Sequence, residues 1–142
     1  MEPTGPELVR RFFAAYATGD LHTLRTAVLA PDAVWHVPGD HPLAGTHRGA
    51  DAIVAYFRRL AECDFRAEVL FQGADDRHVV EVHRCRSDDG TLDTTWVLIF
   101  RIDGGIDGGA DGGVDGERIT EIRKYPADQA QADAFFRRVY AV

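Results

Sequence analysis

The chain has 142 residues, of which 45% are hydrophobic and 27% charged, a composition typical of a single soluble globular domain. Its net charge of -7 argues against nucleic acids and membranes as partners, because both attract basic surfaces. No apolar stretch approaches the length that spans a membrane, and the first residues do not resemble a signal peptide. Cys63 and Cys85 lack metal-ligand spacing, so we expect reduced thiols in a cytoplasmic protein.

The first thirty residues are predicted to form two helices joined by a tight corner. Pro6 suits a first helical turn, and apolar residues recur at helical spacing as far as Tyr16. Gly19 can end a helix in the left-handed conformation, and Asp20 can cap the next helix. We expect Pro31 to stop that second helix, because proline lacks the amide hydrogen that a helix needs.

A short strand at 33–37 is expected to run into a loop rich in His, Pro and Gly. Residues 35–49 contain three of the six histidines of the chain. A rigid loop that carries imidazoles and follows a strand often forms the mouth of a small-molecule pocket. The segment therefore predicts where a site lies, without predicting its chemistry.

The remaining pattern predicts a helix, then four strands, then a closing helix, at 50–61, 65–72, 78–86, 92–102, 118–125 and about 128–140. Helices followed by a run of strands indicate an α+β fold. We expect one domain, 1–142, in which a curved antiparallel or mixed sheet wraps around three to four helices. Such an arrangement forms a cone with an apolar cavity.

Residues 103–116 form a Gly- and Asp-rich repeat with a period of four. The repeat contains seven of the 14 glycines of the chain. Its glycine pattern differs from that of the calcium-binding β-roll, and it has no EF-hand spacing. We therefore expect a flexible hairpin insertion between the last two strands, dispensable for folding.

Several short segments in a fixed order carry a family resemblance: Tyr16-x-x-Gly19-Asp20, Asp32-Ala33-Val34-Trp35 before Pro38-Gly39, Leu43-Ala44-Gly45-Thr46-His47-Arg48-Gly49, 97–102 and 116–125. Together they resemble the nuclear transport factor 2-like superfamily, and within it the SnoaL-like polyketide cyclases and ketosteroid isomerases. The resemblance covers nearly the whole chain. It implies the cone fold but not one function, since this fold hosts isomerases, cyclases, dehydratases, epoxide hydrolases and binding proteins.

The resemblance also shows where this chain departs from the isomerases. Those enzymes use an aspartate base, and they hold the enolate with a tyrosine and a protonated aspartic acid. The corresponding positions here are Val37, Phe12 and Leu98, which are all apolar. A valine cannot take a proton and a leucine cannot donate one. The resemblance therefore does not imply that mechanism, and it weakens the case for cyclase chemistry through the usual aspartate.

Alternation along the strands, with Val37 and Leu98 pointing inward, predicts the cavity wall. The expected substrate-binding residues are Trp35, Val37, Phe57, Trp96, Leu98, Phe100 and Ile122, with His41 and His47 at the rim. By the same family correspondence, Thr120 and Lys124 face inward. Lys124 would then hold or polarise an oxygen of the ligand. The alternative is that the aromatic residues are simply core.

His83 is the expected proton carrier. Glu81 lies two residues away on the same strand face and would orient the imidazole. Both side chains point into the cavity if Val80 and Val82 pack outward, and both are exposed or interfacial otherwise.

His36 is the second histidine considered for catalysis. It neighbours Trp35, so it faces away from the cavity unless a bulge turns it, and a subunit interface is the alternative. Asp40, His41 and His47 match no known zinc spacing, so no metal is expected.

The favoured function is a cofactor-independent isomerase, cyclase or dehydratase that uses acid–base catalysis on a polyketide-like or other cyclic apolar substrate. The alternatives are a non-catalytic binding protein for a small hydrophobic ligand and an interaction module whose sheet mainly dimerises. In each case we expect a homodimer through the outer face of the sheet, because the valines and isoleucine there would otherwise meet water: Val80, Val82, Val97 and Ile99.

Overall fold

The computed structural model describes residues 4–63, 65–104 and 116–140. Its elements in chain order are α1 (Gly5–Thr18), α2 (Leu21–Thr23), the π-helical turn η1 (Leu24–Val28), β1 (Leu29–Val37), β2 (Gly45–Arg48), α3 (Ala50–Leu60), β3 (Phe65–Ala74), β4 (His78–Ser87), β5 (Asp93–Gly104), β6 (Glu117–Pro126) and α4 (Gln129–Val139). Within those ranges, no helix has both the length and the apolar character that crossing a bilayer demands. Residues 105–115 lie outside the described ranges, so the predicted flexible insertion stays a prediction.

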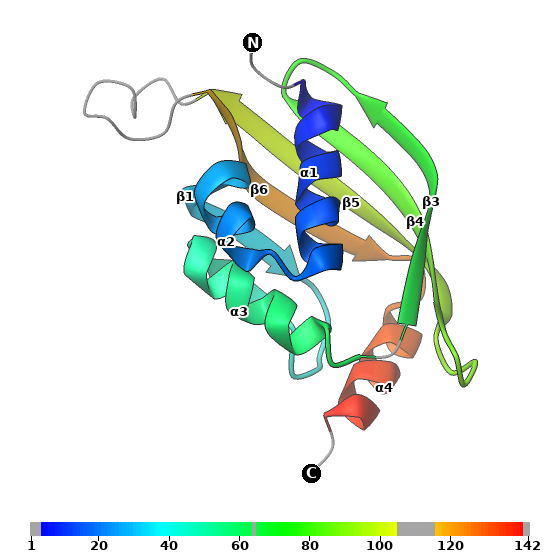
Figure 1. Cartoon of the computed structure of the whole chain (residues 1–142). Helices are drawn as coiled ribbons and strands as arrows, with labels where there is room; N and C mark the ends of the chain where they lie inside the picture. The colour runs from blue at the N-terminus through cyan, green and yellow to red at the C-terminus, as the bar shows by residue number, and fades with distance from the viewer. Residues whose placement is uncertain (1–3, 64, 105–115, 141–142) are drawn as a thin grey trace.

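The six strands form one curved sheet in the order β2-β1-β6-β5-β4-β3. β1 and β6 run parallel, and every other neighbouring pair is antiparallel. The helices α1, α2 and α3 cover one face of the sheet, and α4 lies at one end of it (Figure 1). The predicted α+β fold with a mixed sheet wrapped on helices is therefore confirmed.

The corner between the first two helices forms as predicted. Gly19 has φ 73°, and its amide donates to the Tyr16 carbonyl at 3.1 Å. The Asp20 carboxylate accepts a hydrogen bond from the Thr23 amide at 3.1 Å. This left-handed residue suits glycine, which has no Cβ to clash with the backbone.

Pro31 does not stop the second helix, contrary to expectation. The helical turn ends at Val28, and Pro31 lies inside β1, which begins at Leu29. The β1–β6 register shifts between Leu29 and Val34, so proline occupies a stretch where the ladder is interrupted. The sequence pattern also missed β2, a four-residue strand that pairs with β1 at the edge of the sheet.

Two irregularities decide which residues face the helices. In β6, the register with β5 shifts between Glu121 and Ile119, which leaves Thr120 unpaired. Ile119 is buried, whereas the Thr120 hydroxyl donates to Asp103 at 2.6 Å. The expected inward position of Thr120 is therefore wrong. In β3, a shift between Val69 and Phe71 exchanges the inward and outward faces along the strand.

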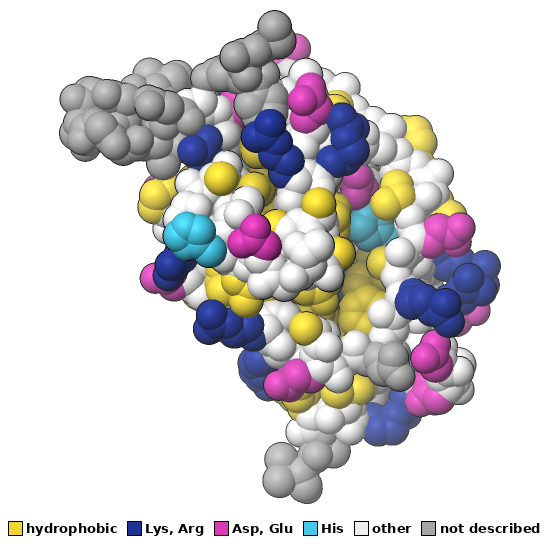
Figure 2. Space-filling view, viewed as in Figure 1, with side chains coloured by type: hydrophobic (Ala, Val, Ile, Leu, Met, Phe, Trp, Pro, Cys, Tyr) yellow, Lys and Arg dark blue, Asp and Glu magenta, His cyan; other side chains and the backbone are white. Residues whose placement is uncertain are grey.

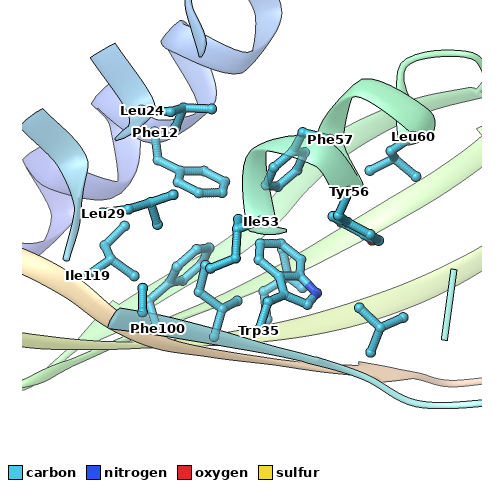
Figure 3. Close-up of a cluster of buried hydrophobic side chains, with 14 of the residues drawn as sticks. Phe12, Leu24, Leu29, Trp35, Ile53, Tyr56, Phe57, Leu60, Phe100 and Ile119 are labelled. Carbon is cyan, nitrogen blue, oxygen red and sulfur yellow. The ribbon is translucent and has the colours of Figure 1, made fainter. Parts of the chain in front are cut away.

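Aromatic packing around Phe12 joins the helical layer to the sheet. The Phe12 ring is fully buried, and its centroid lies 6.0 Å from Trp35, 5.2 Å from Phe57 and 5.7 Å from Phe100. These partners belong to β1, α3 and β5, and Figure 3 shows the rings directed toward one another. Phe12 of α1 therefore packs against a second helix and against two strands of the sheet.

We predict that Phe12→Ala lowers the free energy of unfolding by about 3–5 kcal/mol, because it leaves a cavity among rings that cannot collapse onto it. Urea denaturation followed by tryptophan fluorescence measures the change. Leu70→Ala is the control, since Leu70 is 54% exposed and should change stability by less than about 0.5 kcal/mol. Equal effects of the two substitutions would contradict this account of the core.

Candidate functional site

A cavity of about 610 Å³ lies between the helices and the inward face of the sheet. Its wall is largely aromatic and aliphatic, and it also contains two basic side chains, a carboxylate and an imidazole: Arg10, Lys124, Glu81 and His83. Figure 2 shows a hollow on this face floored by hydrophobic side chains. The volume falls in the range of small-molecule sites, which combine apolar walls with a few placed polar groups.

Glu81 and His83 form a buried pair on β4. Their Oε1 and Nε2 atoms are 2.8 Å apart, and the side chains are only 4% and 5% exposed. Gln72 of β3 donates to the other carboxylate oxygen, Oε2, at 2.5 Å. Because a carboxylate only accepts hydrogen bonds, Nε2 of His83 carries the proton and Nδ1 is the basic nitrogen. Among the described residues, nothing is hydrogen-bonded to Nδ1.

Lys124 is a buried amine without a counter-ion. The residue is 3% exposed, and its Nζ lies 3.4 Å from the centroid of the Trp96 ring and 5.2 Å from that of Phe136. No carboxylate pairs with it in the described part of the chain. Burial lowers the pKa of Lys124 to about 7. Near neutral pH the side chain is therefore divided between ammonium and free amine.

Two further donors in the wall lack partners. The indole nitrogens of Trp35 and Trp96 are buried, and neither has a hydrogen-bond acceptor among residues 4–63, 65–104 and 116–140. Both residues line the cavity that Lys124 lines. Buried donors without partners are costly, and a ligand that brings an acceptor oxygen would satisfy them.

The strand register brings the polar groups together. Glu81 is paired with Leu98, and Leu98 with Lys124, so the three residues form one row across β4, β5 and β6. Two strand spacings separate the ends of this row by about 10 Å between Cα atoms. A ligand lying over Leu98 therefore has the Glu81–His83 pair on one side and the Lys124 amine on the other.

Six of the predicted site residues line the cavity: Trp35, Phe57, His83, Trp96, Leu98 and Lys124. Alternation with Val37 and Leu98 taken as inward accounts for Trp35 and Trp96, and the family correspondence accounts for Lys124. Of the two faces left open for Glu81 and His83, the structure shows the inward one. Phe100 and Ile122 also face inward, but they are fully buried in the core and do not reach the cavity. Their expected role in substrate binding is corrected, because both are fully buried and neither lines the cavity; the Phe100 ring packs against Phe12 and Phe13 of α1.

The predicted catalytic position of His36 is wrong for this cavity. Its Nε2 lies 2.9 Å from Glu121 Oε2 on the opposite face of the sheet, and this hydrogen bond lowers the pKa of Glu121. His36 and Val37 line a separate hollow of about 290 Å³. No bulge turns His36 inward, since β1 and β6 keep a regular register from Val34 to His36.

The two loop histidines, His41 and His47, form hydrogen bonds within their own loop and do not line the cavity. His41 packs against Phe136 at 4.8 Å and accepts from the Leu43 amide, and burial lowers its pKa. His47 lies against Tyr56 at 4.9 Å, with its Nε2 3.0 Å from the Leu43 carbonyl. Neither residue lines the 610 Å³ cavity. Their placement at the pocket mouth is therefore corrected.

Several cavity residues were not predicted from the sequence. Phe13, Tyr16 and Tyr56 enter the wall from α1 and α3, and Gln72 supports Glu81 from β3. Phe13 and Tyr16 belong to the apolar residues that recur at helical spacing in the first helix, and this pattern could have predicted that they face the cavity. Gln72 had no such signal, because its face depends on the register shift in β3.

Comparisons with known proteins agree with this architecture. A family model described as "SnoaL-like domain" matches residues 9–106. The chain is 35% identical to an uncharacterized protein of Mycobacterium tuberculosis over 136 residues, which cover 92% of this chain and 94% of that one. Among solved structures, Bal32a from a soil-derived mobile gene cassette is 31% identical with a TM-score of 0.75, covering 93% of this chain and 95% of its own. An NTF2-like protein of Burkholderia xenovorans is 28% identical with a TM-score of 0.65, covering 91% and 92%.

We predict that Lys124 makes stability depend on pH. Its pKa is about 7 in the folded chain and about 10.4 in the unfolded chain, so between these values the unfolded state binds more protons. The free energy of unfolding should therefore rise with pH, by up to about 1.4 kcal/mol per unit. Urea titrations of the wild type and Lys124→Met from about pH 7 to about pH 9 measure the difference. A difference that stays constant with pH would contradict burial of the ionisable amine.

Proposed function

The chain belongs to the SnoaL-like domain family, and we propose that it is an acid–base catalyst for a small, cyclic, apolar carbonyl compound of polyketide-like character. The observation that carries this proposal is the shared cavity of the buried Glu81–His83 pair and the unpaired Lys124 amine. Family membership supports a ligand-binding cone but names no reaction. The chemistry is therefore argued from the side chains of this chain.

His83 is the proposed general base. Glu81 fixes the Nε2–H tautomer, and Gln72 in turn fixes Glu81, so the imidazole has a defined orientation before a ligand enters. Its Nδ1 can then remove a hydrogen from the carbon next to a carbonyl group. Protonation of His83 places a cation beside the Glu81 carboxylate, which stabilises the product of the transfer.

The ammonium form of Lys124 is the proposed partner of the carbonyl oxygen. Removal of the α-hydrogen moves negative charge onto that oxygen, and a cation in an apolar cavity stabilises the charge strongly. The indole N–H groups of Trp35 and Trp96 are two further donors that line the same cavity. Isomerisation, cyclisation and dehydration of carbonyl compounds all use such an enolate.

The second candidate is a non-catalytic binding protein for a small hydrophobic ligand. Its support is the apolar character of Val37, Phe12 and Leu98, where isomerases of the same fold carry catalytic groups by the resemblance described above. The aromatic wall would bind such a ligand without any proton transfer. The two candidates differ in whether the ligand exchanges hydrogen with solvent.

We predict that the protein accelerates exchange of the α-hydrogens of 2-tetralone, an apolar bicyclic ketone, in deuterium oxide. His83→Ala should lower the protein-catalysed rate by at least about 100-fold, because it removes the proposed base. Proton NMR of the ketone measures the rate. His36→Ala is the matched control and should keep the wild-type rate, since His36 lies on the opposite face of the sheet.

Two outcomes would reject the proposed catalysis. An unchanged rate in His83→Ala would exclude His83 as the base. Binding of the ketone, seen as tryptophan quenching, without faster exchange would instead favour the binding protein.

The homodimer through the outer face stays a prediction. Val82, Val97 and Tyr125 form one cross-strand row on that face, and Tyr125 is 48% exposed. We expect light scattering to give twice the mass of one chain, and Val97→Lys to give the single mass by placing a charge in the contact. Ala14→Lys, on the exposed side of α1, is the control. A wild-type protein of single mass would refute the dimer.

A further inference from the structure

We infer that Lys124 is a nucleophilic amine that forms a protonated imine with the carbonyl carbon of the ligand. This inference rests on the proposed carbonyl ligand of the cavity and adds a covalent step to it. It assigns Lys124 a second role, distinct from donating to the carbonyl oxygen.

The sequence singles out Lys124 among the basic residues. It is the only lysine of the chain, and the other residues among the 16 Lys and Arg are all arginines. Arginine stays charged at any physiological pH and is a poor nucleophile, whereas a buried lysine can lose its proton. The only lysine side chain of the sequence therefore lies in the cavity wall, where its amine can lose its proton.

Nζ is buried without an ion-pair partner among the described residues. The rings of Trp96 and Phe136, with centroids 3.4 Å and 5.2 Å from Nζ, offer a cation–π attraction that does not replace the lost hydration of an ammonium group. Cys63 also lines the cavity, and Cys85 lies buried nearby on β4. Burial raises the pKa of Cys85 to about 12 and raises that of Cys63, so both thiols are neutral and give Nζ no counter-ion. Desolvation of a lysine without an ion pair is one of the known ways to activate it as a nucleophile.

The proposed step balances without any oxidant or cofactor. The Nζ lone pair forms a C–N bond to the carbonyl carbon while the π pair moves to oxygen. The C–O bond then breaks and the oxygen leaves as water, so amine, carbonyl and one proton give a protonated imine and one water. Hydrolysis reverses the step and frees the ligand.

The imine would strengthen the proposed acid–base chemistry. A protonated imine withdraws electrons from the neighbouring carbon more strongly than a hydrogen-bonded carbonyl, so His83 would remove the α-hydrogen more readily. The row Glu81–Leu98–Lys124 places the amine and the base on opposite sides of the same ligand position. One side chain then activates the carbon and the other accepts its proton.

The test is reductive trapping of the imine with 2-tetralone and sodium cyanoborohydride. The hydride reduces a protonated imine to a stable secondary amine, and peptide mass mapping locates the adduct. We predict one adduct per chain at Lys124, and its loss in both Lys124→Met and Lys124→Arg. Tetralin, which has the same ring system without the carbonyl, should compete and lower the yield if the adduct forms inside the cavity.

The variants and the exchange assay separate this inference from the proposed function. Lys124→Arg keeps a cation but cannot form the imine, so a Lys124→Arg protein with wild-type α-hydrogen exchange would overturn the covalent role. His83-dependent exchange without any Lys124 adduct would also overturn it, and would leave the acid–base function intact. An adduct at Lys124 without exchange would support the amine chemistry and reject the acid–base function. Because trapping is done on the wild type, a variant that fails to fold does not decide the result.

Discussion

The cost of placing polar groups inside an apolar cone is the constraint on which the site depends. A buried charge must be paired or neutralised, and this chain uses both solutions on one sheet face. Glu81 is paired, since His83 and Gln72 occupy its two oxygens. Lys124 has no ion-pair partner in the part of the chain that the structure describes, and burial lowers its pKa to about 7. The two solutions give the cavity an oriented imidazole and a buried amine with a lowered pKa.

The scaffold keeps that face accessible while it fills the rest of the cone. Phe12 packs on Phe100 and Phe57, and these rings fill the space between α1 and the sheet around Phe12. Beyond this contact, Phe13 and Tyr16 lie over the cavity instead of filling it, and the Phe13 ring is 5.2 Å from His83. The same helix therefore supplies the core on one side and the wall of the cavity on the other.

Strand alternation, combined with the family resemblance, accounts for much of this arrangement. With Val37 and Leu98 taken as inward, alternation along β1 and β5 predicted the inward positions of Trp35 and Trp96, because those stretches pair without a break. For His83 alternation left both faces open, and the structure places it inward. The inward position that the family correspondence implied for Thr120 was wrong, and alternation could not place Gln72, since each depends on one unpaired residue that exchanges the two faces of a strand. Nothing in a single sequence marks such a residue, because it results from the pairing of two strands.

The loop histidines show a different limit. His41 and His47 are held by local hydrogen bonds to Leu43, and their rings are covered by aromatic neighbours on two separate helices, α4 and α3. Composition drew attention to this loop, but the orientation of the histidine rings depends on contacts with segments distant in sequence.

Leu98 leads to a second conclusion about the site. By the family resemblance it occupies the acid position of the isomerases, and Glu81 and Lys124 flank it on the two adjacent strands. An apolar residue at that position therefore still leaves polar side chains on both adjacent strands, which is compatible with the proposed catalysis in the same cavity.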